Sequence, residues 1–228
     1  AVYGNGTDID DDISAFISNP MEHAEASKIA LFSIADYAWN MDAYKSDASW
    51  RRAVRYLMPG HAAALQVFAS HNSDLGGNEH DFRREESEQI RPALERLLDA
   101  YCREGKREVA AASAVTEECE RMIASADLLL ASDENPALIK EITPWLMQFK
   151  LLGEYGREVL CMLAAQCDGK KTELEKAASH AKALQVLMKK IDATYNQNGF
   201  QPGVKTGSCH LKPAFDRLYQ EVVQRTGK

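Results

Sequence analysis

The stretch "EITPWLMQFKLLGEYGREVL", residues 141–160, decides the fold class of this chain. Its apolar residues recur three or four positions apart, which places them on one face of an α-helix. The members of this stripe are Ile142, Trp145, Leu146, Phe149, Leu152 and Val159. Such a stripe predicts a long amphipathic helix whose apolar face packs in a protein core, and it has no feature of a cofactor site.

Similar stripes precede and follow this one, over residues 90–101, 115–130 and 174–191. Pro213 opens a last helical pattern that carries Phe215, Leu218 and Val222. Several amphipathic helices in succession predict an antiparallel helical bundle after about residue 82. The mainly α fold class follows from these stripes.

The earlier part of the chain is also helical in its pattern. A helix is expected after Asn19 and Pro20, because Glu22 and Glu25 lie near its start, where the helix dipole favours acidic residues. Two shorter helices are expected over residues 40–60 and 61–71. The stretch "NSDLGGNEHD", residues 72–81, is the strongest break, because it gathers the residue types of turns and loops.

Composition and charge exclude several classes of function. The chain has 228 residues, 45% hydrophobic and 27% charged, with a formal net charge of −7 and a pI near 5.4. Nucleic acids and anionic membranes are bound by basic surfaces, so we expect no nucleic-acid partner. No apolar run approaches the roughly 18–20 residues of a membrane helix, so we expect no membrane span.

The five cysteines do not suggest a disulfide framework or a zinc site. Their number is odd and no two form a CxxC pair. Cys119 and Cys161 fall on apolar helical stripes and are expected to be small core residues. Cys209 and His210 are adjacent in a loop, and neighbours of this kind rarely bind one metal together. We therefore expect no metal and no cofactor.

No complete set of catalytic residues is visible. Three successive aspartates at positions 10–12 lie in a polar stretch where all would be solvated, which removes the pKa difference that acid/base catalysis needs. The six histidines form no HExxH motif, and GxSxG and phosphate-binding glycine loops are absent. The charged residues 83–86 are expected to start a helix with intrahelical ion pairs.

Four motifs carry a resemblance to a known family: "SNPMEHAE" (18–25), "HNSDLG…RREES" (71–76 and 83–87), "EITPWLMQFK" (141–150) and "QPGVKT" (201–206). Together they resemble the C-terminal part of glycoside hydrolase family 84. Its bacterial members are O-GlcNAcase-like β-N-acetylglucosaminidases, often labelled hyaluronidases or hyaluronoglucosaminidases. The resemblance covers nearly the whole chain.

The resemblance implies two regions. Residues 1–82 would be the last strand and helix segments of a (β/α)8 catalytic barrel, with "AFIS" (15–18) as the strand. Residues 83–228 would be the helical post-catalytic domain. The expected fold is thus a multi-helical antiparallel bundle preceded by the end of a barrel.

The resemblance also implies an activity for the parent protein. Family members remove terminal β-linked N-acetylglucosamine with retention, using the substrate's acetamido group as nucleophile and two neighbouring aspartates as helpers. Those aspartates lie upstream of the matched region and are not residues 10–12, so the chain alone is expected to be inactive. The alternative is a non-catalytic helical module for barrel bracing, dimerisation or glycoprotein docking.

Asn19 is the residue to which the resemblance assigns a binding role. The corresponding amide of the family hydrogen-bonds a hydroxyl of the bound sugar, and the end of a barrel strand is where such sites lie. An amide there could also simply cap the following helix. The implied partner is a GlcNAc-bearing glycoprotein or glycan, the implied compartment is outside the cytoplasm, and a homodimer is a further expectation.

Overall fold

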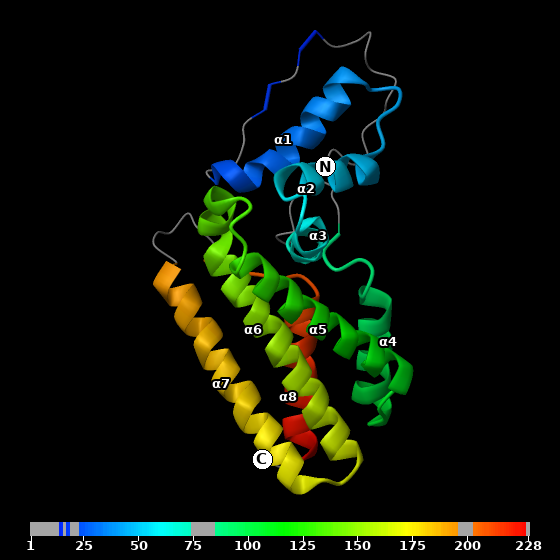
Figure 1. The fold of residues 1–228 in the computed structure, drawn as a ribbon. Coiled ribbons are helices and arrows are strands. Elements are labelled where there is room, and N and C mark those ends of the chain that lie inside the picture. The colour runs from blue at the N-terminus through cyan, green and yellow to red at the C-terminus, as the bar shows by residue number, and fades with distance from the viewer. Residues whose placement is uncertain (1–13, 16, 19–22, 74–84, 196–202, 227–228) are drawn as a thin grey trace.

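The structure, a computed structural model, describes residues 14–15, 17–18, 23–73, 85–195 and 203–226. In these ranges it has eight α-helices and no β-strand (Figure 1). The helices are α1 Ala24–Trp39, α2 Ser46–Leu57, α3 Ala62–Ser70, α4 Arg91–Glu104, α5 Val109–Leu130, α6 Pro136–Cys167, α7 Lys171–Tyr195 and α8 Leu211–Arg225. The predicted mainly α fold is confirmed.

Helix α6 is the centre of the molecule. It has 32 residues and contacts α1, α5, α7 and α8. Its apolar stripe is buried as the sequence predicts, with Leu146, Phe149 and Leu152 fully enclosed. The Asn135 side chain caps its start by accepting a hydrogen bond from the Leu138 N–H at 3.2 Å, next to a proline in the first turn. Its length and apolar face make α6 the element on which the others pack.

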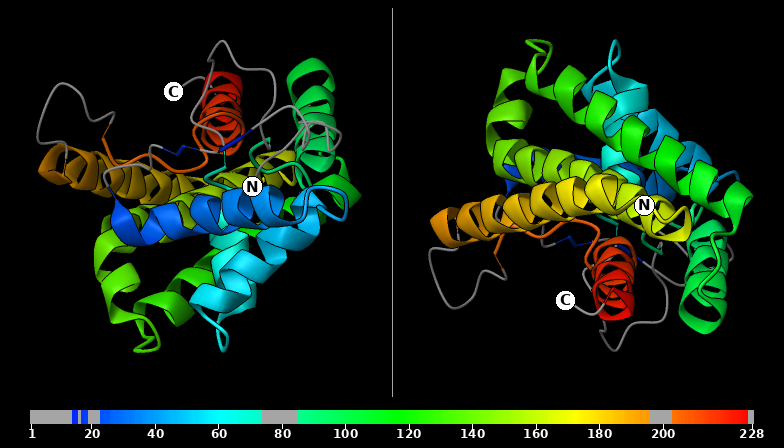
Figure 2. Two further views of the ribbon diagram at one scale, coloured as in Figure 1. Left: turned by 90° about the horizontal axis from the view of Figure 1, so that it is seen from above. Right: turned by 90° about the horizontal axis from the view of Figure 1, so that it is seen from below.

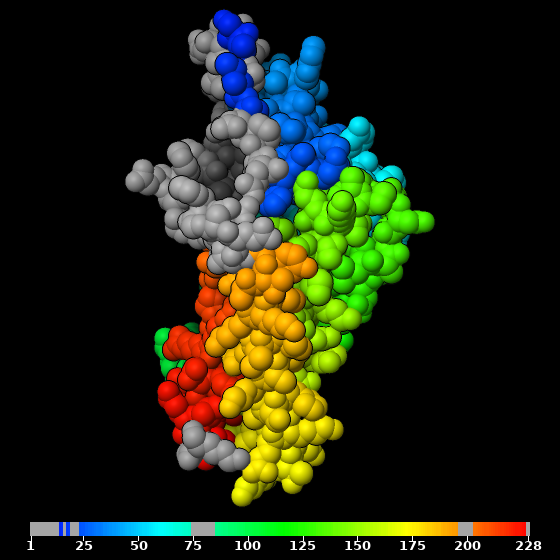
Figure 3. Space-filling view, turned by 90° about the vertical axis from the view of Figure 1, so that its left-hand side faces the viewer, coloured from blue at the N-terminus to red at the C-terminus, as the bar shows by residue number. Residues whose placement is uncertain are grey.

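Helices α5, α6 and α7 are neighbours joined by short turns, whereas α4 and α8 pack on each other along one side of α5 and α6 (Figure 2). Helix α8 approaches α6 closely at Gly156, where an added Cβ would lie 2.5 Å from the Phe215 ring. Helix α7 forms one flank of the molecule (Figure 3). None of the described helices combines the length and apolarity needed to cross a membrane.

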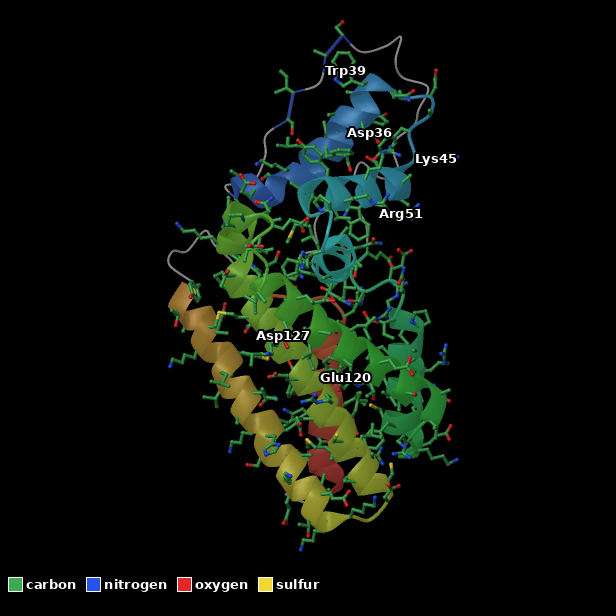
Figure 4. All side chains as sticks on the ribbon, viewed as in Figure 1. Asp36, Trp39, Lys45, Arg51, Glu120 and Asp127 are labelled. Carbon is green, nitrogen blue, oxygen red and sulfur yellow. The ribbon has the colours of Figure 1, made fainter. Side chains whose placement is uncertain are left out.

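Exposed ion pairs connect α5 and α6 along their outer surfaces (Figure 4). Lys150 Nζ lies 2.6 Å from Asp127 Oδ1, and Arg157 Nη1 lies 3.2 Å from Glu120 Oε1. Each of these pairs contributes at most about 1 kcal/mol because water screens it. The apolar interface between α5 and α6 therefore dominates their association.

Helices α1, α2 and α3 lie together at one end of the bundle (Figure 1). Helix α3 packs on α5 and α1 on α6. The Phe68 and Phe149 rings meet edge to face with centroids 5.4 Å apart, which joins α3 to α6. One apolar core therefore runs through residues on both sides of the break at 72–81.

The strand expected over residues 15–18 is not confirmed. Ser14, Ala15, Ile17 and Ser18 belong to no helix or strand, and Ile17 is 98% exposed. A strand requires a neighbour for its backbone hydrogen bonds, and the described residues offer none. The expectation that Pro20 opens this helix is wrong: α1 begins at Ala24, because the preceding His23 has an extended backbone and the first N–H groups are capped by Glu141. Pro20 itself lies outside the described residues.

Two side chains lie where the sequence did not predict them. Cys161 is exposed, because its neighbours Leu160 and Met162 take the core positions of α6, whereas Cys119 is buried as expected. Glu86 is fully buried, and α4 begins five positions later at Arg91. The prediction of a helix start with intrahelical ion pairs is therefore wrong for Glu86, whose carboxylate binds backbone N–H groups of residues 209–211.

Candidate functional site

The start of α1 is the described segment nearest in sequence to Asn19, which itself lies outside the described residues. His23 occupies the N-cap position, and its side chain forms no capping hydrogen bond within the described part of the chain. The capping group comes from α6 instead. Glu141 accepts hydrogen bonds from the backbone N–H of Glu25 at 3.1 Å and of Ala26 at 2.8 Å.

A ring contact adds to this attachment. The His23 imidazole meets the Trp145 indole edge to face, with centroids 5.0 Å apart. Trp145 lies four positions after Glu141, one turn along the same face of α6. Two of the motifs that carry the family resemblance, residues 18–25 and 141–150, therefore contact each other.

A second carboxylate holds the corner between α2 and α3. Glu134 accepts a hydrogen bond from the Gly60 N–H at 2.6 Å and lies 2.9 Å from His61 Nδ1. The Asn135 amide donates to the Leu57 carbonyl at 3.3 Å. The Gly60 N–H and the His61 ring stabilise the carboxylate, which lowers the pKa of Glu134.

A buried polar chain joins α3 to α5 through the segment before α4. His71 Nδ1 lies 2.8 Å from Ser87 Oγ, and His71 Nε2 lies 2.7 Å from Glu118 Oε1. Glu118 also forms an ion pair with Arg121. Burial lowers the pKa of His71 to about 4, helped by the Arg121 charge and opposed by Glu86. His71 is therefore neutral near pH 7, donating from Nε2 to Glu118 and accepting from the Ser87 hydroxyl.

This serine, histidine and glutamate have the residue types of a nucleophilic triad. Ser87 also adopts the left-handed backbone conformation, with a φ of 58°. However, Ser87 and His71 are each only 2% exposed, so very little of either side chain is open to solvent. We interpret the chain of hydrogen bonds as a structural link.

Glu86, next to this chain, caps the start of α8. Its carboxylate accepts hydrogen bonds from the backbone N–H groups of Cys209 at 2.8 Å, His210 at 3.0 Å and Leu211 at 3.4 Å. The Cys209–His210 pair therefore contributes backbone donors to a helix cap. No group of three metal-binding side chains occurs among the residues that the structure describes.

The segment 203–207 contains the described part of the motif "QPGVKT" and contacts residues of two other motifs, Gln148 and His71. The buried Gln148 amide donates to the Val204 carbonyl at 3.2 Å, and Asp192 accepts from the Val204 N–H at 2.8 Å. The Gly207 N–H donates to the His71 carbonyl at 3.0 Å. The motif "QPGVKT" is thus attached to α6 and α7, and its next residue reaches the end of α3.

A pocket of about 230 Å³ lies between α2, α3, α5 and the segment before α4. Its walls include Trp50, Gln66, His71, Glu88 and Arg121. This volume is below the roughly 300 Å³ at which drug-sized ligand sites begin. Ser87 and Glu118 line the pocket as well, so the buried chain of hydrogen bonds forms part of its wall.

Sequence reasoning missed the carboxylates that hold the structure together, Glu86, Glu134 and Glu141. Their bonds join residues 73 to 125 positions apart. Local periodicity carries no signal for pairs so distant. Two of the three, Glu86 and Glu141, do lie within motifs of the family resemblance, which was the available hint. The aspartates at 10–12 and the arginines at 83 and 84 lie outside the described residues.

The described residues form a helical bundle with three shorter helices at one end. Comparisons with known proteins identify the family. A family model described as "Bacterial GH84, post-catalytic domain" matches residues 86–219, more than half of the chain, and a model described as "beta-N-acetylglucosaminidase" matches residues 1–70. The chain belongs to glycoside hydrolase family 84.

Solved structures agree with this assignment. CpGH84B aligns with a TM-score of 0.81 at 22% identity, over 95% of this chain and 35% of that one. CpGH84D aligns with a TM-score of 0.77 at 26% identity, over 90% and 34%. A mutant of the Thermobaculum terrenum O-GlcNAc hydrolase aligns with a TM-score of 0.62 at 19% identity, over 92% and 42%. The chain therefore spans about a third to two fifths of these proteins.

Proposed function

We propose that this chain is the C-terminal part of a retaining, substrate-assisted exo-β-N-acetylglucosaminidase. The parent protein would remove terminal β-linked GlcNAc from glycoproteins or glycans. The observation that carries the proposal is the order of the two family matches, an N-acetylglucosaminidase segment at 1–70 followed by a post-catalytic segment at 86–219. A chain that spans 35% of a relative is consistent with further domains in the parent.

Within this proposal, Asn19 binds substrate and the catalytic aspartates are supplied by the preceding part of the barrel. The amide would hydrogen-bond a sugar hydroxyl, since it offers both a donor and an acceptor. Residues 1–82 would then be the end of the catalytic region and 83–228 the post-catalytic domain. Export from the cytoplasm remains part of the proposal, on the family resemblance alone.

The test is hydrolysis of a chromogenic aryl β-N-acetylglucosaminide. We expect no turnover by the purified chain and clear turnover by a longer protein that includes the preceding region. In that longer protein, Asn19→Ala should lower kcat/KM by about 10-fold to 100-fold, the loss of one or two hydrogen bonds to substrate. Turnover by the chain alone, or none by the longer protein, would contradict the proposal.

Bracing of the barrel is a second candidate function, favoured by the carboxylate contacts. Glu134 and Glu141 both lie in the post-catalytic match and both bind backbone N–H groups in the N-acetylglucosaminidase match. The two functions can coexist, because bracing serves an active barrel.

A further inference from the structure

The pocket beside the buried chain of hydrogen bonds lies between the regions that the two family models match. Trp50 of α2 and Gln66 of α3 line it from the N-acetylglucosaminidase match. Arg121 of α5 and residues 87–90 line it from the post-catalytic match. A molecule bound in this pocket would therefore contact both matched regions.

The inner wall of the pocket is polar and firmly held. His71, Ser87 and Glu118 form this wall, are joined by hydrogen bonds of 2.8 and 2.7 Å, and are each at most 6% exposed. Ser87 has a φ of 58°, a backbone conformation uncommon for serine, and its N–H donates to the Ser70 carbonyl at 2.9 Å. A wall that is already ordered lowers the entropic cost of binding a ligand.

Two glutamine side chains at the pocket have hydrogen-bonding capacity that the described part of the chain does not use. Gln66 is half-buried and Gln89 is exposed, and neither amide forms a hydrogen bond with a described residue. Each amide offers two donors and an acceptor oxygen. Trp50 adds an aromatic ring that is fixed by burial, with 5% exposure. Amides beside an aromatic ring fit a ligand with hydroxyl groups at its edge and C–H groups on its face.

The charges around the pocket disfavour an ionic ligand. The Arg121 guanidinium is paired with Glu118, and Glu85 is paired with Arg91. Glu88 has no ion pair among the described residues, so an anion would meet an uncompensated negative charge. Glu88 is also exposed, so water screens its attraction for a cation. A neutral polar ligand meets neither this repulsion nor the cost of removing an ion from water.

We propose that this pocket binds one neutral sugar ring. Its volume of about 230 Å³ is that of roughly seven or eight water molecules in the liquid, which matches one hexose and is too small for a disaccharide. The sugar hydroxyls bond to Gln66, Gln89 and Glu88, and the C–H face of the ring lies against Trp50. The site contains none of the residues to which the proposed function assigns a role, so the inference goes beyond that function and does not rest on it.

The first experiment titrates the ¹⁵N-labelled chain with glucose, galactose, mannose and N-acetylglucosamine, each to about 100 mM. NMR follows the side-chain amides of Gln66 and Gln89 and the indole N–H of Trp50. At least one hexose should shift these signals saturably, with a dissociation constant of about 1–20 mM, the affinity expected from a few hydrogen bonds and one ring contact. Glucuronate and glucosamine, which carry a negative and a positive charge, should bind at least about threefold more weakly than that hexose.

The second experiment repeats the titration with variants of the two amides. Gln66→Ala and Gln89→Ala should each weaken binding of that hexose by about threefold to tenfold, because each removes hydrogen bonds to the ligand. Gln220→Ala, on the exposed face of α8, is the matched control and should leave the affinity unchanged. Urea unfolding checks that all three variants remain folded.

Three results would overturn the inference. They are the absence of saturable shifts with all four hexoses, binding that both pocket variants leave unchanged, and tighter binding of either charged sugar. The proposed function is tested separately, by turnover in the longer protein, so the failure of one leaves the other standing.

Discussion

At the residue scale, burial decides the chemistry of His71. An exposed histidine beside a glutamate gains a proton readily, because the carboxylate stabilises the imidazolium. His71 is 2% exposed, and its partner Glu118 already forms an ion pair with Arg121. Removal from water therefore outweighs attraction, and the pKa of His71 falls to about 4. The neutral ring can both donate and accept, which is what the bridge between Ser87 and Glu118 requires.

The lowered pKa of His71 predicts a pH-dependent stability. In the unfolded chain the imidazole binds a proton below pH 6.5, whereas in the folded chain it stays neutral down to about pH 4. The unfolded state thus binds more protons between these values, and stability falls as the pH falls through them. Between pH 7 and pH 5 we expect this group to cost about 2 kcal/mol of the free energy of unfolding, as measured by urea titration.

His71→Gln is the matched variant, because glutamine can also donate and accept but does not titrate. It should be less stable than the wild type at pH 7 and should lose less free energy between pH 7 and pH 5. Equal losses in the two proteins would show that His71 is not the titrating group.

At the scale of elements, the helices divide by where their caps come from. Helices α5 and α6 are capped by their own N-cap residues, with Glu108 accepting from the Ala111 N–H at 2.5 Å and Asn135 from the Leu138 N–H at 3.2 Å. Helices α1 and α8 are capped by Glu141 and Glu86, which are distant in sequence. A local cap fixes where a helix begins, and a distant one also fixes where that helix lies relative to its neighbours.

The cap of α8 gives a prediction for stability. Glu86→Ala would leave the N–H groups of residues 209–211 without their acceptor in a buried place, so we expect a loss of about 2–3 kcal/mol in the free energy of unfolding. Glu85→Ala is the control, because this neighbouring carboxylate pairs with Arg91 on the surface and should contribute less than about 1 kcal/mol. Urea unfolding measures both, and equal losses would contradict a capping role for Glu86.

These elements also show what the sequence could predict. The stripes on α5, α6 and α8 were readable because burial of one helix face leaves a local period in the sequence. Glu86 was misread as a surface residue because a charged residue beside other charges normally lies in water. Its burial depends on backbone donors more than 120 positions later, at residues 209–211. Cys161 was misread because a period of 3.6 residues does not distinguish the edge of a stripe from its centre.

At the scale of the whole molecule, helix α1 differs from the buried core because its apolar side chains are only partly covered. Helix α1 carries apolar residues around most of its circumference, including Ile29, Leu31, Phe32 and Ile34, all only partly buried. A helix of this composition is normally covered on all sides. Trp39, at its last turn, is 90% exposed and projects away from the bundle (Figure 4). If the proposed function holds, this surface is where a preceding catalytic region would pack.

Trp39 allows this expectation to be measured. In the chain alone its fluorescence should be red-shifted and readily quenched by acrylamide, because the indole lies in water. In a longer protein that includes the preceding region, the same residue should emit further to the blue and be shielded from acrylamide. Trp39→Phe isolates its signal by difference in both proteins. Trp50→Phe is the control, since Trp50 is 5% exposed and its removal should eliminate a component shielded in both.

Two outcomes of the acrylamide measurement would contradict this expectation, and a third would support it. Equal acrylamide access to Trp39 in the short and long proteins would mean that the preceding region packs elsewhere, and the apolar circumference of α1 would need another cover. Shielding already present in the chain alone, and lost on dilution, would mean that a second copy covers α1, which would support the homodimer. Shielding that appears only in the longer protein, at any concentration, would show that the preceding region covers the last turn of α1, the helix whose first turn is held by Glu141.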